Sequence, residues 1–290
     1  DRVRGLLNAA ARPGILKSAY EDLSPLWDDR PYLFYALKPV SFVKLLFNPS
    51  GGPAEMRWHV RSFQLLVDFF LVAFVCVFAL MLAPLIWFRR SEIEAGRRAH
   101  QGFFLGIFFL LGISFMLVEV SLLQSIFLMM GNPTLTFAVT LGVMLVFTGI
   151  GSMLSGRVDA GSLRPFLVRA AIAAAGLQIA AVCALPVLAP ALQGASLALK
   201  FGFVLVLMAL LATPMGMLFP SALRLAASRG FDMTCWVWGM NGVGSVLGSV
   251  CATIVAMNLG IRAVFMVGIA GYVLIALLAF CLRRYQTAMN

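Results

Sequence analysis

Long apolar runs separated by short polar loops dominate the chain from residue 63 onward. Each run is long enough to cross about 30 Å of hydrocarbon as an α-helix, which rises about 1.5 Å per residue. Runs of this length favour helices over a β-barrel. The pattern therefore predicts an all-α fold, a polytopic membrane bundle of about seven transmembrane helices within residues 63–284. The predicted spans are residues 63–88, 103–130, 133–154, 166–190, 198–220, 236–258 and 261–282.

Composition supports this prediction. The 290 residues are 61% hydrophobic and only 12% charged, about half the charged fraction of a soluble domain. The net charge of +10 does not indicate a nucleic-acid partner, because the basic residues gather in short loops between apolar runs. That placement is typical of the positive-inside bias. The partner indicated is the lipid bilayer, with no nucleic acid.

The basic residues also predict an orientation. The side that carries the C-terminus has eleven arginines in or beside its loops, whereas the opposite loops between spans have only Lys200 and Arg262. The arginine-rich side is the one expected to face the cytoplasm. We therefore predict an integral membrane protein with a cytoplasmic C-terminus, and with seven spans the N-terminal segment falls on the external side.

Residues 1–62 differ from the rest of the chain. They hold nine of the 22 basic and six of the 12 acidic residues, together with Pro- and Gly-containing turns. This composition predicts a soluble or interfacial linker, the tail of a preceding domain in a longer polypeptide. Within it, residues 32–47 mix aromatic side chains with two lysines, which suits either the membrane surface or packing on a soluble domain.

A carboxylate inside the second predicted span is the first candidate functional residue. Glu119 lies in an apolar run of membrane length, where a charged side chain costs about 2.5–3.5 kcal/mol. It either forms a neutral carboxyl hydrogen-bonded between helices or serves as a proton relay or substrate contact. Gln124 lies about 140° from it around a regular helix, so the two share no face. With Asn241, which could bond across helices or cap an unwound turn, they make the candidate intramembrane polar site.

Small residues recur along the sixth predicted span. A stripe of them spaced three or four residues apart favours close helix packing, and a smooth wall for a substrate path is the alternative. Gly244 and Gly248 also form a GxxxG pair. The predicted packing residues are Gly242, Gly244, Ser245, Gly248 and Ser249.

Proline and glycine lie close together in the fifth predicted span. Pro214, Gly216 and Pro220 fall within seven residues, and each proline removes a backbone donor. We predict an interrupted helix there. Broken helices often line transporter binding sites, although membrane helices also tolerate proline.

The chain offers little for a metal or a cofactor. Its five cysteines form no CxxC pair, and its only histidines, His59 and His100, lie outside the spans. The glycines of GVGSVLGS lie in an apolar run and are not a dinucleotide-binding turn. We predict no metal site, no catalytic residue and no cofactor in this chain.

Three segments resemble a known family in the same order. They are FMLVEVSLLQSIFLMMGNPTLTFAVTLGVMLVFTGIGSMLSGR, GMLFPSALRL and WVWGMNGVGSVLGSV. They look like the membrane part of bacterial proteins related to spermidine synthases. LSPLWDDRPYLFYAL, which contains Asp28, Asp29, Arg30 and Pro31, resembles the linker that joins the soluble domain of that family to its helices.

The resemblance implies a Rossmann-like aminopropyltransferase or methyltransferase-type domain upstream of Asp1 and location in the bacterial inner membrane. The small-residue stripe and the linker motif favour other membrane subunits as further partners. Three hypotheses remain open. The first is a non-catalytic anchoring or scaffolding module. The second is a transporter-like module that moves a cation, polyamine or lipophilic metabolite past Glu119, and the third is a membrane enzyme for a lipid-soluble substrate.

Overall fold

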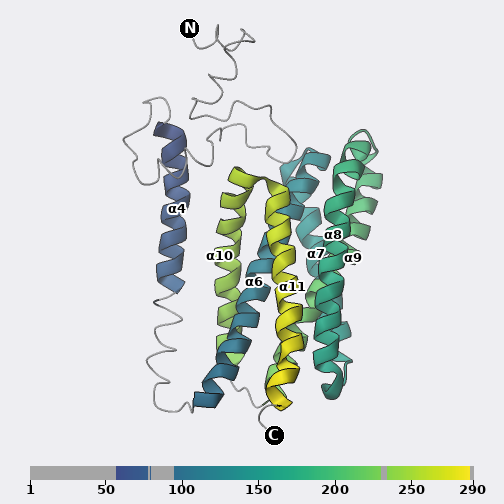
Figure 1. Cartoon of the computed structure of the whole chain (residues 1–290). Helices are drawn as coiled ribbons and strands as arrows, with labels where there is room; N and C mark the ends of the chain where they lie inside the picture. The colour runs from purple at the N-terminus through teal and green to yellow at the C-terminus, as the bar shows by residue number, and fades with distance from the viewer. Residues whose placement is uncertain (1–56, 78, 80–94, 230–233, 288–290) are drawn as a thin grey trace, which may run out of the picture.

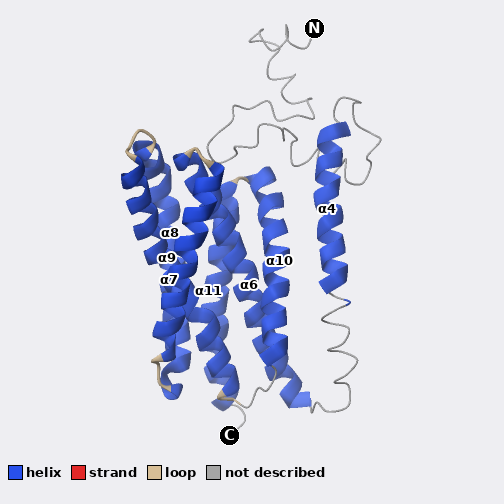
Figure 2. Ribbon diagram, turned by 180° about the vertical axis from the view of Figure 1, so that it is seen from behind, coloured by secondary structure: helices blue, strands red, loops and turns tan. Residues whose placement is uncertain are grey.

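The computed structural model describes residues 57–77, 79, 95–229 and 234–287, and these residues form helices joined by short turns (Figures 1 and 2). The predicted all-α bundle is confirmed. The elements are α4 (Arg57–Val77), α6 (Ala95–Met130), α7 (Pro133–Gly156), the short 3-10 helix η4 (Ala160–Ser162), α8 (Leu163–Leu192), α9 (Leu197–Ala227), α10 (Thr234–Leu259) and α11 (Ile261–Thr287).

Among the described residues, the six helices from α6 to α11 are long and apolar enough to cross a membrane. The chain is therefore an integral membrane protein. The first predicted span, residues 63–88, begins inside α4, whose apolar part is Val67–Cys76. The remainder of that span lies largely outside the described residues.

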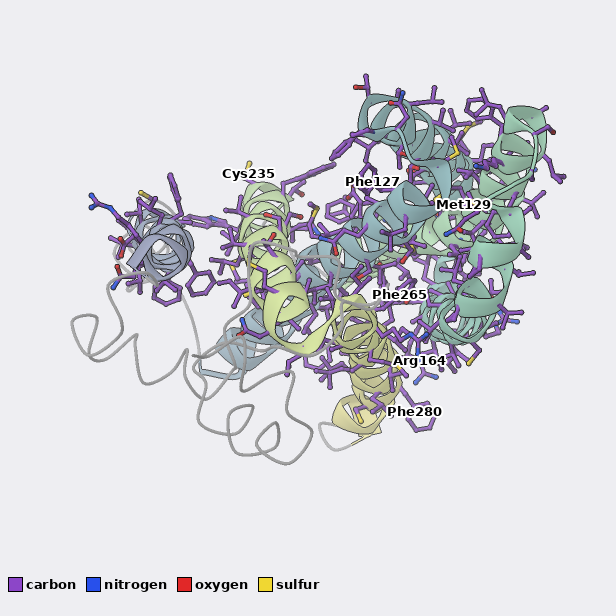
Figure 3. The ribbon with its side chains drawn as sticks, turned by 90° about the horizontal axis from the view of Figure 1, so that it is seen from above. Phe127, Met129, Arg164, Cys235, Phe265 and Phe280 are labelled. Atoms are coloured by element: carbon purple, nitrogen blue, oxygen red, sulfur yellow. The ribbon has the colours of Figure 1, made fainter. Side chains whose placement is uncertain are left out.

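Helix α6 is the centre of the bundle (Figures 1 and 3). It packs most extensively on α10 and α11, and it also contacts α7, α8 and α9. Helix α7 pairs with α9, while α8 packs on both α9 and α11. Helix α4 stands at the edge, against α10.

Short turns make consecutive helices antiparallel, and two of these turns require glycine. Gly131 and Gly260 have φ values of 72° and 93°, a region that side-chain-bearing residues rarely occupy. Their amides bond the carbonyls of Phe127 and Ala256 at 2.9 and 3.0 Å, so that each glycine ends its helix in a left-handed turn. Asn132 then caps α7, because its side chain accepts a hydrogen bond from Leu135 N at 3.1 Å.

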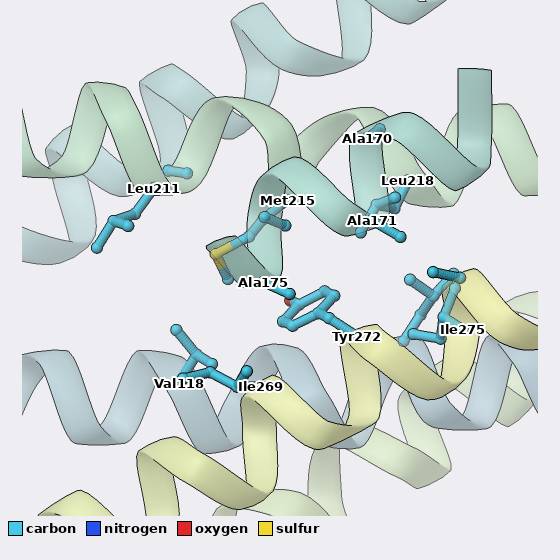
Figure 4. Close-up of a cluster of buried hydrophobic side chains, with 14 of the residues drawn as sticks. Val118, Ala170, Ala171, Ala175, Leu211, Met215, Leu218, Ile269, Tyr272 and Ile275 are labelled. Carbon is cyan, nitrogen blue, oxygen red and sulfur yellow. The ribbon is translucent and has the colours of Figure 1, made fainter. Parts of the chain in front are cut away.

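The core is apolar and so is the outer surface. Figure 4 shows part of the core, where alanines of α8 leave room for Met215 of α9 and Tyr272 of α11. On the outside, Leu145, Met153 and Val187 are 69%, 74% and 71% exposed. An outer surface that is as apolar as the core is expected when the bundle is surrounded by lipid.

The predicted break in the fifth span is wrong. Helix α9 runs without interruption from Leu197 to Ala227, with Pro214 and Pro220 inside it. The missing amide donors are tolerated because α9 is packed between α7 and α8. Hydroxyl groups of Thr213 and Ser221 add hydrogen bonds of 2.7 Å to carbonyls one turn earlier, those of Ala209 and Met217.

Candidate functional site

Glu119 lies half-buried in the second half of α6. Phe108 and Ile126, eleven and seven residues away, share its side of the helix, and both are buried. Glu119 therefore faces protein on at least one flank. It makes no hydrogen bond or ion pair with any residue that the structure describes, and it interacts electrostatically with Tyr272, which is fully buried on α11.

Gln124 does not join Glu119. Helix α6 is continuous across both residues, so the predicted offset of about 140° holds. The three predicted polar residues thus do not form one site.

Asn241 bonds across helices, as one of its two predicted roles required. Its side-chain amide donates to the Phe108 carbonyl of α6 at 3.2 Å. Aromatic rings continue this junction: Phe108 meets Phe219 of α9 at 5.2 Å, and Phe219 meets Trp238 of α10 at 4.6 Å between centroids. These contacts join three helices and give Asn241 a structural role.

The α6–α10 interface depends on missing side chains on both helices. A Cβ atom on Gly112 of α6 would overlap the Asn241 carbonyl oxygen, and one on Gly244 would overlap that of Phe109. Gly248 lies somewhat less close to Ile113, whose carbonyl oxygen and Cα would be 2.9 and 3.0 Å from an added Cβ. The helices therefore touch backbone to backbone, and the predicted packing role of Gly244 and Gly248 is confirmed.

The other predicted packing residues differ in what they contact. The Ser245 amide nitrogen borders Gly112, at 2.9 Å from a built Cβ, whereas the Ser249 hydroxyl bonds the Val246 carbonyl of its own helix. Gly242 was wrongly included, since it is exposed and nothing lies within 4 Å of its added Cβ. It lies two positions before Gly244, which is about 200° around the helix, so it faces away from α6.

Gly216 has a different role from the predicted one. Rather than marking a helix break, it packs on the backbone of Thr148 in α7, and Gly151 of α7 packs on the backbone of Thr213. This second reciprocal pair fixes α7 against α9. Sequence reasoning missed Gly112 and Gly151 because nothing along one helix identifies the opposing glycine.

Two basic side chains have structural roles that the sequence did not predict. The Arg224 guanidinium donates to the carbonyls of Ser155, Gly156 and Val158 at 2.8, 3.3 and 2.7 Å. It thereby caps the C-terminus of α7, where carbonyls lack helical donors. At the other end of α9, Lys200 Nζ donates to the Met129 carbonyl near the end of α6 at 3.1 Å.

The cytoplasmic-side prediction rests on a cluster of arginines at one end of the bundle. There, burial and the neighbouring Arg164 guanidinium lower the pKa of Arg229. The opposite end carries Lys200 and Arg262. The two ends of the described bundle thus differ in charge as the loop pattern predicts.

Several buried polar groups lack partners among the described residues. Both amide atoms of Gln178 on α8 and the hydroxyls of Ser114 and Thr140 make no hydrogen bond there. Gln178 is fully buried. It is a lone amide in the apolar run 166–190, so the argument that selected Glu119 could also have selected it.

A cavity of about 130 Å³ lies between α6, α8 and α11, at the end of the bundle that holds the α6–α7 and α10–α11 turns. Met129 and Phe265, two of its lining residues, are labelled in Figure 3. Nine of its twelve lining residues are apolar, so its walls suit a hydrophobic ligand. Glu119 and Asn241 do not line it.

No group of three or more His, Cys, Asp or Glu residues within the described ranges could hold a metal ion. The predicted linker motif Asp28, Asp29, Arg30 and Pro31 lies outside the described residues. Comparisons of the chain with protein-family models, with curated proteins and with solved structures found no match.

Proposed function

We propose that this chain is a non-catalytic membrane module that anchors and scaffolds a spermidine synthase-like fused protein in the bacterial inner membrane, with the arginine-rich end in the cytoplasm. The observation that carries the scaffold role is the backbone-to-backbone packing of two helix pairs, α6 with α10 and α7 with α9. Each contact has room only for glycine, so sliding one helix along the other would press a neighbouring side chain against the opposing backbone. Such a bundle is suited to hold partners at fixed positions.

Helix α4 supplies the docking surface in this proposal. Leu65, Phe69, Val72 and Val75 are between 53% and 67% exposed, and α4 packs at the edge of the bundle against α10. A second membrane subunit could cover this apolar helix as readily as lipid does. The upstream soluble domain of the same polypeptide would be the other partner.

A transporter-like module for a cation or polyamine is the second candidate. Its supporting observation is Glu119, a carboxyl inside the bundle that no described cation pairs with and that lies in electrostatic range of Tyr272. Intramembrane acids often mark ion or proton pathways.

Flux measurements separate the two candidates. We expect proteoliposomes that contain the purified chain to take up radiolabelled spermidine no faster than protein-free liposomes. We also expect Glu119→Gln to leave this background unchanged, with Asn241→Gln as the control at the structural polar residue. Uptake that depends on protein and disappears in Glu119→Gln would replace the scaffold with the transporter.

The fused-domain part has its own test. The polypeptide ahead of Asp1 should contain a strand, a glycine-rich turn and an acidic residue about 20 positions further on. A different fold there would remove the spermidine synthase-like part and leave the scaffold role to be judged by the flux result.

A further inference from the structure

The cavity between α6, α8 and α11 combines apolar walls with one cationic residue at its rim. Its lining includes Val182 and Leu185 of α8 and Phe265 of α11, whereas Arg262 lies in the first turn of α11. Leu185 and Phe265 are buried, and Arg262 is exposed. The cavity is therefore apolar inside and positively charged where the helices end.

The volume limits what can enter. A cavity of about 150 Å³ admits benzene, so 130 Å³ has room for a chain segment of roughly five carbons. A linear acyl chain meets this limit, because the rest of the chain can continue along the exposed apolar surface. Transfer from bilayer to cavity moves the chain between two apolar media, so the cavity selects by shape and not by hydrophobicity.

The basic residues near the cavity favour a ligand with a negatively charged headgroup. Arg262 of α11 and Lys200 of α9 are basic residues at this end of the described bundle, and Lys200 bonds the carbonyl of Met129, itself a cavity-lining residue. Arginine binds phosphate through two parallel hydrogen bonds. At the edge of a membrane span it reaches the headgroup level.

Helix α8 has backbone carbonyls without helical donors at residues that line the same cavity. Pro186 and Pro190 have no amide hydrogen, so the carbonyls of Val182 and Pro186 have no helical donor four residues ahead. Both residues line the cavity, as does Gln193. Acceptors of this kind suit a headgroup that carries hydroxyl donors as well as a phosphate.

We propose that this cavity is a binding site for an anionic phospholipid, with one acyl chain between α8 and α11 and the phosphate on Arg262. The site lies apart from Glu119 and is independent of the scaffold role. It gives the bundle a preference among the lipids that surround it.

Lipid titration of the delipidated, detergent-solubilised protein tests this site. We expect native mass spectrometry to measure tighter binding of phosphatidylglycerol than of phosphatidylcholine with the same chains. One basic residue near the headgroup accounts for about a fivefold preference. Arg262→Gln should abolish the preference, whereas Arg169→Gln should keep it, because Arg169 is an exposed arginine near the opposite end of α8.

Two further arms test the cavity itself. Ala189→Phe should fill it and lower the affinity for both lipids, and Ala189→Leu serves if the larger ring prevents folding. Glycerophosphoglycerol without acyl chains should not compete. Equal binding of both lipids, retention of the preference in Arg262→Gln, or tighter binding of free oleate than of phosphatidylglycerol would each overturn the proposal.

Discussion

Replacing Gly112 with alanine should loosen the centre of the bundle. The new methyl group would overlap the Asn241 carbonyl oxygen and lie 2.9 Å from the Ser245 amide nitrogen. Both obstacles are backbone atoms of α10, which cannot rotate away as a side chain could. Helices α6 and α10 must therefore move apart.

The magnitude follows from three contributions. Overpacking of this kind costs about 1–3 kcal/mol, and losing the Asn241–Phe108 hydrogen bond costs roughly 0.6 kcal/mol more, as is usual between membrane helices. Alanine regains up to about 1 kcal/mol of helix propensity. Gly106→Ala is the matched control on the same helix, since nothing lies within 4 Å of its added Cβ.

The control cancels the propensity gain, so the two variants should differ by about 2–3 kcal/mol in unfolding free energy. Thermal unfolding in one detergent would measure this as a fall of roughly 5–10 °C for Gly112→Ala relative to Gly106→Ala. A melting temperature of Gly112→Ala that matches that of the unsubstituted protein would refute the backbone contact between α6 and α10. An equal fall in both variants would also contradict it, because it would show that α6 does not tolerate alanine in general.

Three other substitutions test separate contacts. Arg224→Ala removes three hydrogen bonds to the end of α7 and should cost about 2–3 kcal/mol, measured by thermal unfolding against Arg169→Ala; equal effects would contradict the capping role. Gln178→Leu should stabilise the protein by about 1–3 kcal/mol, because it removes a buried amide without described partners, whereas a loss of stability would mean that water or a ligand satisfies that amide. Asn132→Ala should lower the free energy of unfolding by about 1 kcal/mol because it removes the cap of α7, whereas Asn132→Ser should keep most of that stability. Slower hydrogen exchange at the start of α7 in Asn132→Ala would contradict this.

The sequence predicted features that depend on one helix at a time. Six of the seven spans are present because each needs only an apolar run of membrane length. Gly244 and Gly248 were found because their spacing places them on one face. Asn241 was recognised because a polar side chain near the end of an apolar span needs a partner.

Features that depend on two helices were missed. The cost of Pro214 and Pro220 is decided by what packs around α9, which no local pattern contains. Gly216 was assigned to a break although its role is the contact with Thr148. Gly242 shows the converse error, a small residue in the right span on the wrong face.

The hydrogen bonds at the two ends of α9 have a consequence for how the protein responds to the bilayer. Lys200 fastens one end of α9 to α6, and Arg224 fastens the other end to α7. The two residues are 24 positions apart, which is about 36 Å along a helix axis, slightly more than the usual hydrocarbon thickness of about 30 Å. Helix α9 is thus held at both ends and cannot shift along its axis without breaking the hydrogen bonds of Lys200 or Arg224. When the bilayer becomes thinner, the bundle must tilt as a unit or thicken the lipid next to it, so membrane thickness acts on the whole protein through this one helix.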